Sequence, residues 1–360
     1  MEHLLEVREL SVAFRDDAHQ LNTVVDHVSF HVDPGEILCI VGESGCGKSV
    51  TSLAIMNLLS RNGRITSGQV LFDGQDLLKL SEKELDRIRG SKLTMIFQDA
   101  LTSLNPVFTV GWQLTESLRI HLGLTKDQAS EKAVELLRKA GLPDAMATMK
   151  KYPHQLSGGQ RQRVMIAIAL SCGPKLLIAD EPTTALDVTI QAQIMKLTRD
   201  LIHELNMSMI LITHDLGLVA EMADRVMVMY AGQVVETADV FTLFKHPSHP
   251  YTKALLGSVP SIYDASDRTL LSIRGTVPES YENLIGCRFA DRCDHTCENC
   301  REKETGQTLF SAGEDHLVRC ILYSGAEHAS GNSIDAPVQT SCSDRANQSP
   351  TDREEVTDHG

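Results

Sequence analysis

ILCIVGESGCGKSVT, residues 37–51, joins a short apolar run to a glycine-rich loop and then to an apolar helical pattern. Gly42, Gly47, Lys48 and Ser49 match the spacing G-x-x-x-x-G-K-[ST]. Glycines let consecutive N–H groups converge on one anion, and the following helix adds the positive end of its dipole. We therefore predict a buried strand, a phosphate-binding loop and a helix that begins near Lys48.

A loop of this kind divides nucleotide binding between its backbone and its side chains. Lys48 can reach the β- and γ-phosphates, and the Ser49 hydroxyl can ligate Mg²⁺. The other positions offer backbone N–H groups. The predicted ATP contacts here are Gly42, Glu43, Ser44, Gly45, Cys46, Gly47, Lys48, Ser49 and Val50. A ligand-free strand–helix turn is the alternative, and the apolar residues on both sides make it the weaker interpretation.

Length and composition favour a globular protein of two or three domains. The chain has 360 residues, 42% of them hydrophobic, and a net charge of −14. The acidic balance argues against nucleic acid as a partner, because phosphate backbones need clustered Lys and Arg. No apolar run approaches a membrane span, and residues 1–15 show no signal-peptide pattern. We expect a cytosolic protein whose nine cysteines are thiols or metal ligands.

Strand patterns surround the phosphate loop. Residues 4–14 and 24–32 indicate strands, and apolar side chains alternate with polar ones in the second. They suggest an antiparallel sheet beside the phosphate-binding core, and residues 67–73 indicate a further short strand. Phe14 ends the first strand, where an aromatic ring can stack on adenine. Ordinary packing of this ring is the alternative.

Later apolar runs end in polar side chains. They are residues 92–98, 175–181 and 208–213, which end at Gln98, at Asp180 with Glu181, and next to His214. In an open α/β sheet, ligands bind at the carboxyl ends of the strands. Asp180 is suited to hold the Mg²⁺ shell, and Glu181 to orient or deprotonate a water that attacks the γ-phosphate. A strand end that turns acidic on meeting solvent is the alternative.

The segment from about 99 to 160 has a helical character and lies between two stretches of sheet pattern. Residues 110–122 and 127–141 carry apolar side chains at helical spacing, so we expect a helical insertion. Leu156-Ser157-Gly158-Gly159-Gln160 then opens a long helix. Ser157 is a favourable N-cap, and two glycines at a helix start make a second anion-receptive helix end.

The order of these motifs resembles the ATP-binding subunit of an ABC transporter. The order is Phe14, 42–49, Gln98, 156–160, Asp180 with Glu181, Leu186 with Asp187, and His214. LSGGQ matches the signature of that family without a mismatch, and the resemblance covers roughly residues 4–250. It implies an α/β fold with a P-loop NTPase core, that is, a mixed sheet with helices. An antiparallel β subdomain, a helical insertion and a small cysteine-rich C-terminal extension accompany this core.

The same resemblance implies a role for each motif. Phe14 corresponds to the residue that stacks on adenine. Gln98 corresponds to the glutamine that senses Mg²⁺ and the γ-phosphate, and His214 to the γ-phosphate switch. Glu181 corresponds to the general base, and Asp187 to the dimer-contact loop. The signature residues Ser157, Gly158, Gly159 and Gln160 correspond to those that contact ATP held by the opposite subunit of a head-to-tail pair.

The carboxy-terminal third narrows the family. HPYTKALL from residue 249 and IRGTVP at 273–278 resemble the extension of oligopeptide and dipeptide importer ATPases, a group that includes nickel importers. Taken alone, the His/Pro run at 246–252 indicates only a linker. We expect an ATP-binding domain over 1–245, the extension over 246–324 and a disordered tail over 325–360, whose composition is polar.

The extension contains a cysteine cluster. Its members are Cys287, Cys293, Cys297, Cys300 and Cys320. Thiolates select zinc or iron–sulfur clusters, and free thiols are a third possibility. The resemblance to peptide-importer ATPases implies a [4Fe–4S] cluster on Cys287, Cys293, Cys300 and Cys320. The pattern departs at Asp291, where proline is usual, and at Cys297, an additional thiol that could substitute for Cys300 as a ligand.

These observations predict an ATPase that powers peptide uptake. Implied cofactors are ATP, Mg²⁺, bound by Ser49, Gln98 and Asp180, and the [4Fe–4S] cluster. Implied partners are two membrane permease subunits, a second identical or homologous ATPase and an extracytoplasmic substrate-binding protein. The chain would lie on the cytoplasmic face of the inner membrane, without nucleic acid. A nickel importer ATPase, a soluble ABC ATPase and a redox sensor remain alternatives.

Overall fold

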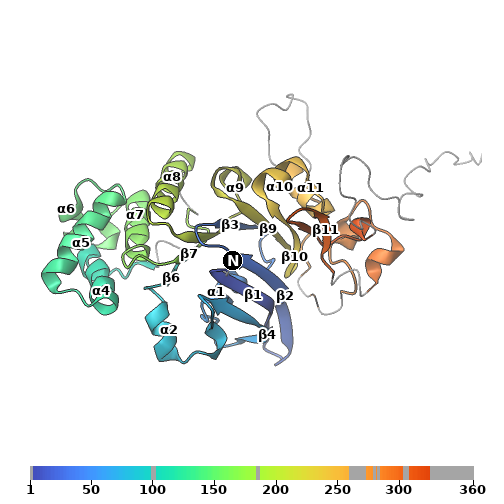
Figure 1. Ribbon diagram of the computed structural model, residues 1–360, viewed down its shortest axis with the longest axis horizontal. Coiled ribbons are helices and arrows are strands. Elements are labelled where there is room, and N and C mark those ends of the chain that lie inside the picture. Colours follow the sequence, from blue (N-terminus) through green and yellow to red (C-terminus); the bar gives the residue numbers. More distant parts are fainter. Residues whose placement is uncertain are drawn as a thin grey trace, which may run out of the picture.

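The structure is a computed structural model in which an extended sheet carries helices at both ends. It describes residues 3–98, 103–183, 187–258, 273–278, 281, 284–302 and 308–324. Leu186 and the predicted tail over 325–360 lie outside the described residues. A helical group lies at one end of the molecule and the carboxy-terminal segment at the other (Figure 1).

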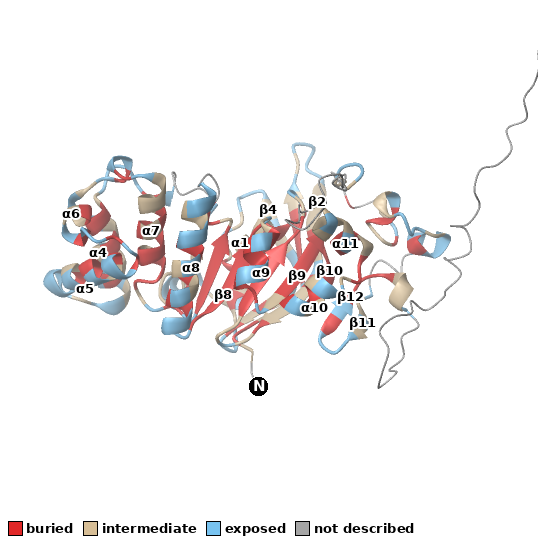
Figure 2. Ribbon diagram, turned by 90° about the horizontal axis from the view of Figure 1, so that it is seen from above, coloured by how far each residue is buried: buried red, intermediate tan, exposed pale blue. Residues whose placement is uncertain are grey.

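The central sheet has the strand order β11-β12-β10-β9-β3-β8-β7-β6. Its parallel strands are β3 (Ile37–Val41), β6 (Leu93–Ile96), β7 (Leu176–Asp180), β8 (Ser208–Ile212) and β9 (Arg225–Tyr230). Every residue of β3, β7 and β8 is buried, and Figure 2 shows this part of the sheet as a continuous buried layer. The predicted apolar runs are thus strands covered on both faces, as parallel sheets require.

The strands that flank the phosphate loop form a second, antiparallel sheet. Its order is β2-β1-β4-β5, with β1 (Leu5–Arg15), β2 (Leu21–Val32), β4 (Gly63–Phe72) and β5 (Gln75–Asp76). The predicted antiparallel sheet is therefore confirmed. Helix α1 (Lys48–Ile55) packs on β1 and β2 and also on β7 of the central sheet. It joins the two sheets through a shared apolar core.

Alternating residues of β3 separate two hydrophobic cores. Leu38 and Ile40 face the core that contains α1 and the antiparallel sheet. Ile37, Cys39 and Val41 face the core that contains the helices on the other side. This is the two-residue period of a strand. Because β3 is anchored on both faces, the loop that leaves its carboxyl end starts from a rigid position.

Four α-helices are described in the predicted helical segment and at its end. They are α4 (Val110–Leu122), α5 (Lys126–Lys139), α6 (Ala145–Lys150) and α7 (Gly158–Ala169). Thr109, Thr125 and Asp144 cap the first three by accepting a backbone N–H. Helix α7 packs on α4, α5, α8 and β6, so it ties the helical group to the edge of the central sheet.

The remaining elements complete the sheet and cover it. They are α2 (Glu82–Ile88), α8 (Val188–Glu204), α9 (Leu216–Met222), β10 (Gln233–Asp239), α10 (Val240–Lys245), α11 (Pro250–Gly257), β11 (Phe310–Gly313) and β12 (His316–Val318). Strands β9 and β10 pair as an antiparallel hairpin, with Ala231 and Gly232 at its turn. Strand β12 pairs with β10, so the carboxy-terminal segment joins the same sheet.

Candidate nucleotide site

The phosphate loop connects β3 to α1, and α1 begins at Lys48 as predicted. Gly42 and Gly47 have φ angles of 150° and 100°. A Cβ on Gly42 would lie 2.2 Å from the Met229 carbonyl oxygen, and one on Gly47 would lie 3.0 Å from that of Val24. Both positions therefore need glycine for backbone conformation and for space. Backbone atoms of β9 and β2 lie directly beside the loop and restrict its conformation.

Lys48 lies inside the curl of the loop. Its ammonium group donates to the carbonyl oxygens of Gly42 and Glu43 at 2.8 and 3.0 Å. The residue is only 6% exposed, so a positive charge is held among backbone groups at the centre of the loop. A bound phosphate would find this charge beside the N-terminus of α1, where the helix dipole is also favourable.

Ser49 and Asp180 form a pair beside the loop. The Ser49 hydroxyl donates to Oδ1 of Asp180 at 3.0 Å, which joins α1 to the end of β7. Burial raises the pKa of Asp180, and the hydrogen bond from Ser49 opposes that shift. Hydroxyl and carboxylate oxygens are the hard ligands that Mg²⁺ prefers. The pair therefore fits a magnesium ion that bridges the protein and a nucleotide.

Gln98, Glu181 and His214 converge from three parallel strands. The Gln98 side-chain amide donates to Oε2 of Glu181 at 3.0 Å. Nδ1 of His214 lies 3.4 Å from Oε1 of Glu181. The residues follow β6, β7 and β8, which are adjacent in the sheet. Side chains that sequence reasoning assigned separately to strand ends thus contact one another, next to the Ser49–Asp180 pair.

The signature residues lie apart from this group. Ser157 accepts the Gln160 backbone N–H at 3.3 Å, and the Gln160 side chain accepts the Ser157 N–H at 3.1 Å. This capping box opens α7, and Ser157 is exposed. Helix α7 packs on β6. Strand β6 is the third strand from β3 in the sheet, so the two strands are about 14 Å apart at ordinary strand spacing. The signature is thus at the exposed start of a helix that packs on β6, whereas the phosphate loop leaves β3.

Phe14 and Asp187 have local structural contacts. Phe14 lies near the end of β1, half-buried, opposite Gly63 of β4. A Cβ on Gly63 would lie 2.6 Å from the Phe14 ring, so glycine makes room for it. Asp187 caps α8 by accepting the Ile190 N–H at 2.9 Å. Their predicted roles toward adenine and toward a second subunit stay predictions.

Sequence reasoning missed a set of contacts from the carboxy-terminal segment to the phosphate loop. The Tyr251 hydroxyl accepts the Glu43 backbone N–H at 2.8 Å, and the Tyr281 hydroxyl donates to the Gly45 carbonyl at 3.1 Å. Arg292 forms a double hydrogen bond with the Glu43 carboxylate. More than two hundred residues separate the partners, so no local sequence pattern pointed to them.

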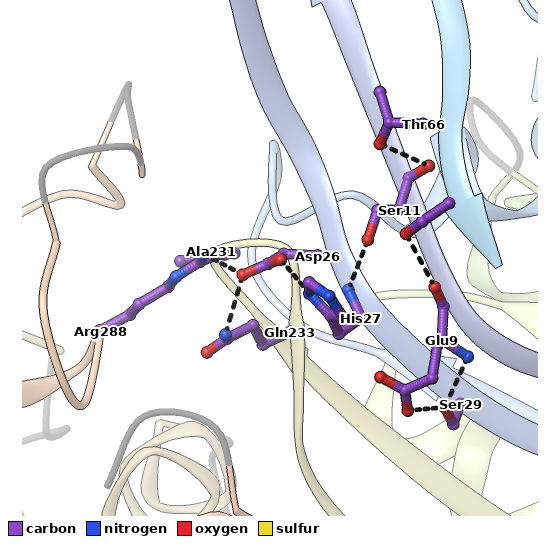
Figure 3. A network of polar contacts seen from close by, with 10 residues as sticks. Glu9, Ser11, Asp26, His27, Ser29, Thr66, Ala231, Gln233 and Arg288 are labelled. Carbon is purple, nitrogen blue, oxygen red and sulfur yellow. Dashed lines mark hydrogen bonds and ion pairs between the residues drawn. The ribbon is translucent and has the colours of Figure 1, made fainter. Parts of the chain in front are cut away.

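A second connection runs from the same segment to the hairpin turn. Arg288 donates to the Ala231 carbonyl and to Asp26 of β2, and Gln233 donates to Asp26 at 3.1 Å (Figure 3). The N–H of Gly232 in turn donates to the Cys46 carbonyl at 3.0 Å. The carboxy-terminal segment, the antiparallel sheet and the phosphate loop therefore form one hydrogen-bonded unit.

The four cysteines predicted as cluster ligands line one cavity. Its other lining residues are His249, Pro250, Phe289, Ala290, His295, Ile321 and Leu322. Burial raises the pKa of Cys287, that of Cys293 to about 11 and that of Cys320 to about 12. Cys297 does not line this cavity, although its Sγ lies 3.6 Å from that of Cys300.

No three of the cysteine thiols that line the cavity lie within 4.8 Å of one another. In the part of the chain that the structure describes, the one group of three His, Cys, Asp or Glu donor atoms within 4.8 Å of one another is His3, His31 and Asp33, which is remote in sequence. A zinc ion with Zn–S bonds of about 2.3 Å holds thiolates about 3.8 Å apart. None of the cavity's cysteine thiols belongs to such a group, so no three of them stand at the separations that a zinc ion would impose.

The His/Pro run is not the simple linker that its composition indicates. His249 is 1% exposed, caps α11 by accepting the Tyr251 N–H at 3.0 Å and lines the cysteine cavity. Burial lowers its pKa to about 4. The run is a buried junction between the hairpin, α11 and the cavity. Its histidine acts as a neutral cap.

The fold and the site together define an ABC-type P-loop ATPase. The family described as "ABC transporter" matches residues 25–184, and the family described as "Oligopeptide/dipeptide transporter, C-terminal region" matches residues 235–300. This chain belongs to the family of ATP-binding proteins of oligopeptide and dipeptide ABC transporters. None of the described helices is long and apolar enough to cross a bilayer.

Similar curated proteins carry peptide-transport names. The oligopeptide transport ATP-binding protein AppD of Bacillus subtilis is 51% identical over 332 residues, covering 91% of this chain and 100% of that protein. The dipeptide transport ATP-binding protein DppD of Escherichia coli is 50% identical over 310 residues, covering 86% and 94%. These relatives support the interpretation as a peptide-transport ATPase. They give no support to the alternatives of a nickel importer ATPase or a soluble ABC ATPase.

A similar solved structure is a dimeric ATP-binding cassette in a post-hydrolysis state, bound to ADP and phosphate. It is 28% identical with a TM-score of 0.59, and the alignment covers 66% of this chain and 98% of that one. A cassette from Clostridium perfringens, part of a larger transporter complex, is also 28% identical with a TM-score of 0.58, covering 68% and 92%. The predicted fold class is confirmed.

Proposed function

We propose that this chain hydrolyses ATP to power the uptake of dipeptides or oligopeptides through separate membrane subunits. The observation that carries the proposal is the convergence of Gln98, Glu181 and His214 next to the Ser49–Asp180 pair. In this proposal Glu181 activates the attacking water, and His214 and Gln98 orient its carboxylate toward the γ-phosphate. The relatives named for peptide transport support the choice of cargo.

Mg²⁺ fits the oxygen ligands that the site offers. Ser49 and Asp180 already face each other at 3.0 Å, and Gln98 lies on the neighbouring strand end. With ATP bound, the ion would neutralise charge on the β- and γ-phosphates beside Lys48. Residues 42–50 would supply the surrounding backbone N–H groups and the helix N-terminus.

A second ATPase subunit would complete the site. Ser157, Gly158, Gly159 and Gln160 form an anion-receptive helix start whose N-cap residue is exposed. In a head-to-tail pair it would contact ATP on the opposite loop, and the loop at Asp187 would contact the partner. The dimeric arrangement of the similar cassette structure supports this pairing. ATP would then hold two subunits together until hydrolysis.

The permease contact is proposed at an exposed apolar surface near Gln98. Val107 is 70% exposed, and the rings of Phe108 and Trp112 stack at 3.9 Å with Trp112 44% exposed. Phe97, next to Gln98, is 43% exposed. Large exposed apolar side chains in one region favour a protein partner. We infer that this surface docks on the permeases, of which the transporter would have two. The chain would then lie peripherally on the cytoplasmic face of the membrane, and a substrate-binding protein would act on the other side.

The cysteine cavity fits a [4Fe–4S] cluster. Cys287, Cys293, Cys300 and Cys320 would hold it, since all four line the same cavity and thiolates are the usual ligands of such clusters. When bound, the cluster would cross-link segments of the extension, and its redox chemistry would be available there. Asp291, at the position where proline is usual, pairs with Arg301 at the surface and does not line the cavity.

The hydrolytic role is tested by Glu181→Gln in the purified transporter. Loss of a general base lowers the rate by about 100-fold or more, so turnover should nearly cease while ATP still holds the two ATPase subunits together. Glu204→Gln, which alters an exposed carboxylate paired with Lys139, is the matched control and should leave the rate unchanged. Wild-type turnover in Glu181→Gln would refute the assignment.

The cargo is tested by uptake into vesicles that contain the complete transporter and its binding protein. Labelled di- or tripeptides should accumulate with ATP and should stimulate ATP hydrolysis. Nickel uptake without peptide uptake would contradict the peptide proposal. It would leave the ATPase assignment intact.

The cluster is tested by purification without oxygen. Iron and acid-labile sulfide should copurify, with broad absorbance at about 400 nm. Serine at any of the four lining cysteines should remove iron, whereas Cys297→Ser should retain it. Zinc without sulfide, or metal-free protein with an unchanged fold, would contradict the cluster.

A further inference from the structure

Arg292 connects the cysteine-rich segment to the phosphate loop. Its Nη1 and Nη2 donate to the two carboxylate oxygens of Glu43 at 2.6 and 2.9 Å. The Arg292 side chain is 7% exposed and that of Glu43 is 27% exposed. This is the bidentate arginine–carboxylate geometry, which is strong and directional. It joins residues that are 249 positions apart in the chain.

The guanidinium group is itself held rigidly. Nε donates to the Arg274 carbonyl at 2.6 Å, Nη2 to the Gly275 carbonyl at 3.2 Å and Nη1 to the Tyr230 hydroxyl at 3.3 Å. Together with the two bonds to Glu43, these contacts use the whole donor capacity of an arginine side chain. The ring centroids of Tyr230 and Phe289 lie 5.6 and 5.9 Å from the guanidinium carbon. A group fixed in this way can fix its partner.

Glu43 would otherwise be unfavourable where it stands. It follows Gly42 at the start of the loop that binds a triphosphate, so its free carboxylate would repel the ligand. Its side chain is instead turned to Arg292, while its backbone N–H is held by Tyr251 and the Gly45 carbonyl by Tyr281. The extension thus neutralises the carboxylate and restrains the backbone on either side of it.

We propose that Arg292 is a positioning residue of the nucleotide site that acts through Glu43. It holds the phosphate loop in the conformation that accepts ATP and keeps the Glu43 carboxylate away from the phosphates. The inference rests on the proposed function, because it requires that this loop binds ATP. Arg292 also directly precedes Cys293, which lines the cysteine cavity, so one short segment serves the cavity wall and the loop.

The test measures the affinity of the full-length chain, in its purified complex, for a fluorescent ATP analogue with Mg²⁺. The variants are Arg292→Gln, Arg292→Lys, Glu43→Gln and the double variant Arg292→Gln/Glu43→Gln. Arg301→Gln is the matched control, because Arg301 forms an exposed ion pair with Asp291 in the same segment. Thermal unfolding and iron content of each variant show whether the fold and the cavity are retained. ATPase assays give KM and kcat.

The expected result is selective for Arg292 and depends on Glu43. If Arg292→Gln reduces the competent loop population to about one tenth, the apparent Kd and the KM rise about tenfold. Because Arg292 does not touch the reacting atoms, kcat should change much less. The Kd of Arg292→Lys should lie between those of the wild type and Arg292→Gln, because lysine keeps the positive charge but cannot form the bidentate hydrogen bond. In the Glu43→Gln background the same arginine change should have little further effect.

Two outcomes would overturn the inference about Arg292 and leave the ATP site assignment intact. One is wild-type affinity in a folded Arg292→Gln variant. The other is an equal loss of affinity on Arg292→Gln in the wild-type chain and in the Glu43→Gln background. If Arg292→Gln does not fold, Glu43→Gln breaks the same pair from the loop side and must itself weaken binding. A folded wild-type complex that binds no ATP analogue would instead overturn the ATP site, and this inference with it.

Discussion

At the scale of single residues, the site depends on an unusual backbone conformation. Glu181 has a φ angle of +44°, and its N–H donates to the Ile212 carbonyl at 2.9 Å. Non-glycine residues in this region are uncommon and cost roughly 1 kcal/mol or more. The strand-to-strand hydrogen bond holds the conformation. As a result, the carboxylate leaves β7 toward Gln98 and His214 instead of continuing the strand.

His249 predicts a pH dependence of stability. Burial lowers its pKa to about 4, below the ordinary 6.5, so the unfolded chain takes up a proton first as the pH falls. Stability from this group is full above about pH 6.5 and is lost progressively toward pH 4, by about 2 kcal/mol at pH 5. Urea unfolding at pH 7 and pH 5 should show this loss, and His249→Asn, which keeps a capping side chain, should reduce it.

The control for this prediction is His246→Asn, which replaces an exposed histidine in the same run. Its pH dependence should match that of the wild type. An equally steep loss of stability in His249→Asn would show that other groups cause the effect.

At the scale of elements, α7 combines a functional start with a tightly packed body. Its N-cap Ser157 is exposed, whereas Val164, Met165 and Ile166 are buried. Gly159 lies against α8, where a Cβ would come within 2.9 Å of the Ile190 Cγ2 atom. Glycine at this position thus lets two helices approach closely.

Gly159→Ala should therefore destabilise the contact between α7 and α8. Overpacking of this kind costs about 1–3 kcal/mol, and thermal or urea unfolding measures it. In an Ile190→Ala background the clash is removed, so the same change should cost less. Equal costs in both backgrounds would contradict the proposed contact.

At the scale of the whole molecule, the carboxy-terminal segment is part of the ATPase fold. Strand β12 pairs with β10, and the fully buried Glu236 accepts the N–H groups of Ser248 and His249 at 2.7 and 2.8 Å. Nε2 of His316 lies 2.8 Å from the same carboxylate. These bonds hold the pKa of Glu236 below its ordinary value against the opposing effect of burial. One charged side chain thus joins the hairpin, α11 and β12.

Glu236→Gln should weaken this junction. The amide replaces an acceptor oxygen with a donor that faces other donors, at a cost of about 1–3 kcal/mol. Hydrogen exchange should accelerate at residues 316–318, and the free energy of unfolding should fall. Glu82→Gln, at an exposed ion pair with Arg89, should change neither quantity. Unchanged exchange at β12 in Glu236→Gln would contradict this role.

Much of the fold and the core of the candidate site were predictable from local sequence patterns. The apolar runs at β3, β7 and β8 are fully buried strands, and strands covered on both faces of a parallel sheet have near-continuous apolar sequences. The phosphate loop was recognisable because its motif glycines, Gly42 and Gly47, stand where the local backbone has a positive φ angle. The polar residues after the strands were recognisable because chemistry in parallel sheets gathers at that edge.

Sequence alone therefore determined the phosphate loop, the polar strand ends, the signature helix and the family. Tertiary structure alone decided that Gln98 meets Glu181 across 83 residues, and that Arg292 meets Glu43 across 249. Local patterns report on neighbours within a turn or a strand, whereas strand order and side-chain packing bring distant segments together. The dependence of the phosphate loop on the cysteine-rich segment thus appears only in the folded chain.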